Sequence, residues 1–131
     1  MVEITNEMKR EINNWKASLG SMADENILMK ARLSNMLKEN FDISLLPQVE
    51  NLYSHLLKEE EFINLLRHNI GELDSMIESG HSKFLNKTRF ENMWSTLQSQ
   101  MMTARIRLTN LKSEFNEFFR QEKGMAPLQT E

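Results

Sequence analysis

The chain has 131 residues, of which 27% are charged and 40% are hydrophobic, and its formal net charge is −3. This length fits one domain, and the composition is typical of a chain that folds on its own. The negative charge argues against a dedicated binder of nucleic acid or of an anionic membrane, because such proteins are normally basic. The absence of cysteine excludes a disulfide framework, a thiolate metal site and a cysteine nucleophile.

The beginning of the chain shows no basic segment followed by an apolar run, which is the pattern of a signal peptide. No uninterrupted apolar run approaches the roughly 20 residues that a bilayer-spanning helix needs. We therefore expect a cytoplasmic protein that has no membrane partner and no nucleic-acid partner.

Apolar residues recur with alternating spacings of four and three over three long stretches of the chain. These stretches run from Met8 to Asn40, from Leu45 to Ile77 and from Phe90 to Phe118. Of the 29 positions that follow this spacing, here named the core positions, 26 are apolar, and the exceptions are Asn26, Asn40 and Glu59. Such spacing keeps one narrow stripe of a helix turned toward its neighbours, as in coiled coils.

The pattern predicts three long helices near residues 5–39, 44–79 and 83–123. The turns between them are short, and short turns force consecutive helices to run antiparallel. We therefore expect an all-α fold, an antiparallel three-helix coiled-coil bundle that looks like a spectrin-type repeat in shape only. Residues 1–131 should form a single domain with a short flexible tail from about residue 124.

Residues that begin and end helices occupy both predicted turns. Asp42 or Ser44 can cap the second helix, and Pro47 is tolerated in its first turn because amides there have no intrahelical acceptor. Gly80 suits a left-handed residue at the end of the second helix, and Ser82 suits a cap of the third.

Antiparallel pairing through these turns predicts which core positions lie in one layer. Positions on the first two helices meet where their numbers add up to about 85, and positions on the last two where they add up to about 164. Trp15, Ile70 and Trp94 then share one layer.

The same register brings the two internal polar core positions together. Asn26 and Glu59 fall in one layer with Ala104, and Arg105 and Arg107 flank Ala104 on the third helix. A buried carboxylate without a partner is very costly, so we expect either arginine to reach Glu59, and Arg105 is assigned to the layer. Such a layer normally fixes helix register. The alternative is a ligand or metal site, although one carboxylate and one amide are too few ligands for tight metal binding.

The segment Ser54–Glu59 resembles the histidine-phosphotransfer motif, in which a histidine on a helical bundle is followed by x-Leu-Lys-Gly. The resemblance implies that His55 is a phosphoacceptor and that Lys58 stabilises the phosphoryl charge. The sequence departs from the motif at Glu59, where the family has glycine, and a glutamate adds negative charge beside a phosphoryl group.

The three histidines follow one another at intervals of 13 residues, which places them on different faces of a helix. They cannot converge on a metal within one chain, and the sequence shows no glycine-rich phosphate loop and no catalytic triad order. We expect no catalytic residues, no metal and no cofactor.

Several large apolar residues lie outside the core positions. Those at the edge of a stripe should be partly covered by the third helix, and they are Leu37, Phe62, Met76, Met93 and Phe119. Those on outward positions are candidate interface residues, and they are Ile27, Leu28, Leu57, Leu65, Met102 and Ile106. Apolar residues that gather outside a core indicate an interface. The sequence thus favours a non-enzymatic interaction or scaffold bundle, which forms a homo-oligomer or docks a partner helix; the alternative is phosphotransfer through His55.

Overall fold

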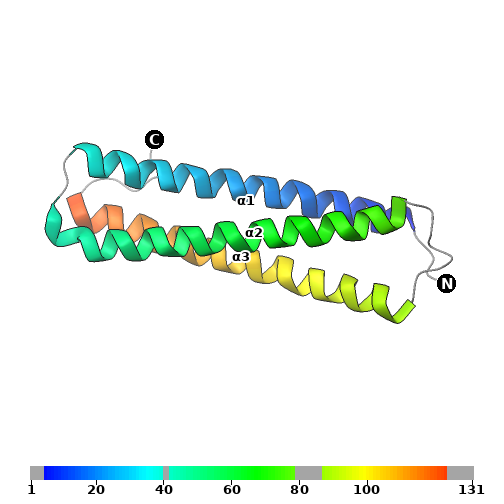
Figure 1. Cartoon of the computed structure of the whole chain (residues 1–131). Coiled ribbons are helices and arrows are strands. Elements are labelled where there is room, and N and C mark those ends of the chain that lie inside the picture. The colour runs from blue at the N-terminus through cyan, green and yellow to red at the C-terminus, as the bar shows by residue number, and fades with distance from the viewer. Residues whose placement is uncertain (1–4, 40–41, 79–86, 124–131) are drawn as a thin grey trace.

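The computed structural model describes residues 5–39, 42–78 and 87–123 and shows three long helices side by side (Figure 1). These are α1 (Asn6–Glu39), α2 (Leu46–Glu78) and α3 (Lys87–Lys123), and a short 3-10 helix, η1 (Ile43–Leu45), precedes α2. Consecutive helices run in opposite directions, which confirms the predicted all-α three-helix bundle. The predictions for Asn40, Gly80 and Ser82, for the helix limits at 79 and 83 and for the tail from 124 lie outside the described residues.

Short polar side chains begin the first two helical segments. The Thr5 Oγ1 atom accepts a hydrogen bond of 3.1 Å from the backbone N–H of Met8 at the start of α1. Asp42, which is one of the two predicted caps, accepts a hydrogen bond of 3.0 Å from the N–H of Ser44. This hydrogen bond from the Ser44 backbone holds the pKa of Asp42 below its usual value. The predicted start of the second helix near 44 thus becomes a 3-10 turn that leads into α2.

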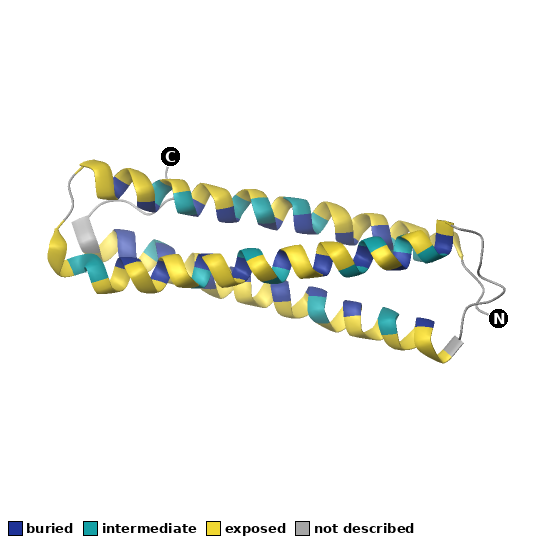
Figure 2. Ribbon diagram, viewed as in Figure 1, coloured by how far each residue is buried: buried dark blue, intermediate teal, exposed yellow. Residues whose placement is uncertain are grey.

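The core positions form a continuous buried stripe along the inner side of the bundle (Figure 2). Every core position in the described ranges is buried except Met8, Leu45 and Trp94, which are partly exposed. No helix in these ranges combines the length and the apolar character that a membrane span requires. The coiled-coil spacing therefore accounts for nearly the whole core.

The two tryptophans meet across α1 and α3. Their ring centroids lie 4.8 Å apart and the ring planes are tilted by 43°. Trp15 and Ile70 are buried, as the register predicts, whereas Trp94 is partly exposed and also stacks on Phe90 at 6.2 Å. The predicted pairing of the tryptophans is present, but Trp94 is less deeply buried than a core position should be.

Ion pairs beside the stripe identify which flank of each helix faces which neighbour. Lys30 Nζ lies 2.8 Å from Glu60 Oε1 and joins α1 to α2. Lys112 Nζ lies 2.9 Å from Glu25 Oε1 and joins α3 to α1. The flank of α3 that carries Lys112 therefore faces α1.

Candidate functional site

Asn26 and Glu59 are the two buried polar residues among the described ones. The Nδ2 group of Asn26 donates a hydrogen bond of 3.1 Å to the backbone carbonyl of Leu56, across from α1 to α2. Glu59 lies one helical turn after Leu56, so the structure places both predicted polar residues at the same level of the bundle. The Asn26 Oδ1 atom is buried and has no hydrogen-bond partner among the described residues.

Arg107, and not Arg105, provides the positive charge beside Glu59. The Arg107 Nε atom lies 3.2 Å from Glu59 Oε1, and the guanidinium group stands over the Phe62 ring at 4.7 Å from its centroid. Arg105 is exposed, so its assignment to the buried layer is wrong. Position 105 lies seven residues before Lys112 and therefore on the flank of α3 that faces α1, whereas position 107 lies on the flank that faces α2.

The Glu59 carboxylate is poorly solvated. Burial raises the pKa of Glu59 above its usual value, and the positive charge of Arg107 opposes this effect only in part. The contact with Arg107 lacks hydrogen-bond geometry, and neither carboxylate oxygen accepts a hydrogen bond from the described residues. Arg107 therefore balances the charge of Glu59, but the carboxylate oxygens lack hydrogen-bond donors among the described residues. This is an unfavourable state for a buried carboxylate.

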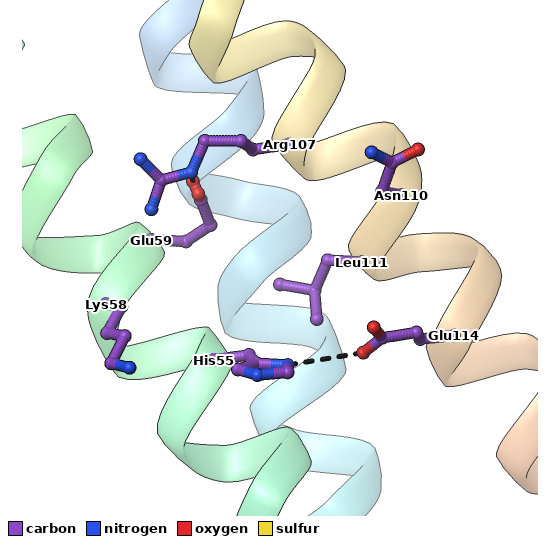
Figure 3. A pocket seen from close by; sticks show the side chains of 7 residues that line it. All are labelled: His55, Lys58, Glu59, Arg107, Asn110, Leu111 and Glu114. Atoms are coloured by element: carbon purple, nitrogen blue, oxygen red, sulfur yellow. Dashed lines mark hydrogen bonds and ion pairs between the residues drawn. The ribbon is translucent and has the colours of Figure 1, made fainter.

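A small pocket of about 190 Å³ opens beside Glu59 between α2 and α3 (Figure 3). His55, the predicted alternative phosphoacceptor, lies in this pocket with its Nδ1 atom 3.2 Å from Glu114 Oε1. Lys58 and Arg107 also line it, so that two cationic and two carboxylate side chains surround the histidine. An anion bound here would meet Lys58 and Arg107, but it would also be repelled by Glu59 and Glu114.

His55, Glu59 and Glu114 are side chains of types that bind metals, and all three line this pocket. Within the described ranges, however, no three histidine, aspartate or glutamate residues lie close enough together to hold a metal ion. The pocket therefore offers polar contacts to a small molecule but not a ready set of metal ligands.

A larger and more apolar groove, of about 850 Å³, runs between α1 and α2. Two of the candidate interface residues, Ile27 and Leu57, line this groove and are exposed. Leu37 and Tyr53 are exposed in the same groove, and neither was among the candidate interface residues. We name the surface formed by Ile27, Leu37, Tyr53 and Leu57 the α1–α2 groove.

The other candidate interface residues are exposed outside this groove. Leu28, Leu65, Met102 and Ile106 line no part of it, so the six candidates do not form one surface. The prediction that the third helix partly covers Leu37 is wrong, because Leu37 is 42% exposed on a side of the α1–α2 pair that α3 does not line. It faces α2 rather than α3, and no α3 residue lines the groove. The spacing of four residues between Tyr53 and Leu57 is the signal that could have revealed the groove in the sequence.

The remaining edge residues behave as predicted or are buried more deeply. Phe62, Met76 and Met93 are partly buried, and Phe119 is buried against Phe115 and Phe118.

Comparison of the chain with protein-family models, with curated proteins and with solved structures found no match.

Proposed function

We propose that the protein is a non-enzymatic interaction bundle that binds a second copy of itself through the α1–α2 groove. The observation that carries this proposal is that four large, exposed apolar side chains gather in one groove between the antiparallel helices α1 and α2. Burial of apolar surface is the main driving force for protein association, and a groove between two helices accommodates the apolar face of further helices. The proposal includes a cytoplasmic location, in keeping with the absence of cysteine.

Two exposed residues on different faces provide a matched test. Leu57 lies in the α1–α2 groove, whereas Ile106 lies on α3 outside it, and both side chains are exposed in the single chain. Leu57→Glu should weaken association because it places a charge in the apolar contact. Ile106→Glu should leave association unchanged. Sedimentation velocity or light scattering over a range of concentrations measures the effect, and circular dichroism checks that both variants stay helical.

A wild-type chain that stays monomeric up to high micromolar concentrations would contradict self-association. Equal weakening by Leu57→Glu and Ile106→Glu would contradict the assignment of the groove, because it would indicate a contact that involves α3.

Phosphotransfer through His55 is the second candidate function. The position of His55 supports it, because this half-exposed histidine shares a pocket with Lys58 and Arg107. Glu114 beside the Nδ1 atom can fix the tautomer of the ring, as carboxylates do in other histidine sites. Incubation with a small phosphodonor such as acetyl phosphate or phosphoramidate should then label the wild type but not His55→Gln. An unlabelled wild type would leave the interaction bundle as the only proposal.

A further inference from the structure

We infer that two copies pack groove to groove about a two-fold axis parallel to the helices, so that α1 of each copy lies against α2 of the other. This inference rests on the proposed function, since it specifies how the second copy occupies the α1–α2 groove. The result is a central antiparallel four-helix arrangement, with α3 of each copy on its outer side.

A second copy can cover the groove with two-fold symmetry in two ways. If the axis runs parallel to the helices, α1 faces the partner's α2 and the two copies point the same way. If the axis runs across the helices in the plane of contact, α1 faces the partner's α1 and α2 faces the partner's α2. Both arrangements bury the same groove, so the residues that line it must decide between them.

The apolar residues permit either arrangement. Ile27 and Leu57 lie at the same level of the bundle, because the neighbouring Asn26 side chain reaches the carbonyl of Leu56. With the parallel axis, Ile27 of each copy therefore meets the partner's Leu57. With the crosswise axis, Ile27 would instead lie near the partner's Leu37, which is also an apolar contact.

The charged residues of the groove favour the parallel axis. Lys30 is the charged residue that lines the groove from α1, and Glu50 is the one that lines it from α2. With the parallel axis, the helix that carries the lysine faces the helix that carries the glutamate, and this happens twice by symmetry. With the crosswise axis, each lysine faces the helix of the other lysine and each glutamate that of the other glutamate. Like charges at a contact cost energy, and complementary charges fix orientation.

Lys30 keeps an intramolecular partner in this arrangement. Its Nζ atom lies 2.8 Å from Glu60 Oε1, and the partner's Glu50 would lie about five residues further along the facing α2, so Lys30 attracts Glu50 across the contact while it stays bonded to Glu60. Glu50 is exposed and makes no ion pair within the described residues, so it is available for such a contact. The groove thus carries a positive charge on its α1 side and a negative charge on its α2 side. Two copies bring these opposite charges together only if the two-fold axis runs parallel to the helices.

The absence of cysteine makes cross-linking a direct test. Ser34 lines the groove from α1 and Ser54 lines it from α2, at a similar level of the bundle. The variants Ser34→Cys and Ser54→Cys are prepared separately, and Ser54→Cys is labelled with nitrogen-15 so that intact mass separates the three dimers. The two are mixed, left to exchange subunits and oxidised mildly. Ser113→Cys, an exposed position on α3, is the matched control.

We expect the mixed dimer between positions 34 and 54 to exceed both homodimers together, and the control to stay uncross-linked. Glu50→Lys should in addition raise the dissociation constant by about two- to tenfold, as loss of a complementary pair at a contact does. Homodimers of Ser34→Cys in excess, or a stable dimer in which no groove cysteine cross-links, would overturn the parallel axis while self-association stands. A chain that remains monomeric would overturn the proposed function itself.

Discussion

The Arg107 Nε atom lies 3.2 Å from Glu59 Oε1, so a side chain that is 45% exposed neutralises one that is only 5% exposed. The two partners therefore differ in what they lose when the pair is broken. Arg107 can return to water, whereas Glu59 would stay in the core with its charge uncompensated. Substitutions at the two positions should consequently have opposite effects.

Glu59→Leu should leave the bundle folded, with a free energy of unfolding equal to that of the wild type or higher by about 1–4 kcal/mol, because an apolar side chain removes the desolvation cost. Arg107→Met should lower the free energy of unfolding by about 1–3 kcal/mol at neutral pH, because it leaves Glu59 buried and unpaired. Urea denaturation followed by circular dichroism measures both. A Glu59→Leu chain that does not fold would instead identify the ion pair as obligatory.

The pKa of Glu59 also predicts how stability depends on pH. A carboxyl group whose pKa is raised on folding binds its proton more tightly in the folded state, so its contribution to stability falls as the pH rises from the unfolded pKa through the folded pKa. Glu59→Gln cannot titrate, so it should be more stable than the wild type at pH 7, and this advantage should shrink as the pH falls toward about 4.5. Denaturation of both proteins between pH 4.5 and 7.5 gives the difference directly. A difference that is independent of pH, or that grows at low pH, would contradict the raised pKa.

The two tryptophans should differ in their contribution to stability. Trp15→Ala should lower the free energy of unfolding by about 3–5 kcal/mol, because this side chain is buried on all sides. Trp94→Ala should cost less, because Trp94 is partly exposed. Met102→Ala, on the outer side of α3, is a control that should change stability very little. Thermal unfolding of the three variants ranks them, and equal losses at the two tryptophans would contradict the difference in burial.

Gly71 offers a simple stabilising substitution. It lies inside α2, and a Cβ atom added there meets nothing within 4 Å. Gly71→Ala should therefore raise the free energy of unfolding by about 0.5–1 kcal/mol, since alanine loses less backbone freedom in a helix. Gly20→Ala in α1 is the companion variant, because its Cβ atom would make only an ordinary contact of 3.7 Å with Arg67. A loss of stability in Gly71→Ala, measured by denaturation, would indicate a close contact that the bundle does not show.

The spacing of apolar residues predicted the core because an apolar stripe on a long helix leaves water only when it faces the neighbouring helices. Asn26 and Glu59 could be placed at one level for the same reason, since short turns set the register. The ion-pair partner of Glu59 could not be chosen, because Arg105 and Arg107 both flank Ala104 in the sequence. Only the order of the three helices around the bundle decides which flank of α3 faces α2.

The α1–α2 groove was missed for a related physical reason. The spacing within the first helix predicts that Leu37 is covered only if every edge position lies under the third helix. In the structure α3 covers one side of the α1–α2 pair and leaves the other side open, so Leu37 and Tyr53 stay exposed there. Coverage of an edge depends on the side from which the third helix approaches, and the spacing within one helix does not contain this information.

The contact between Trp15 and Trp94 joins two residues that are separated by the whole of α2. Contacts between consecutive helices can begin next to the turns that join them, whereas every contact between α1 and α3 closes a loop that includes the whole of α2 and therefore carries a larger entropic cost. Folding should thus form the pairing of neighbouring helices early and bring α3 onto α1 late. Since these are the only two tryptophans in the chain, their fluorescence reports the last step of folding, with no label added.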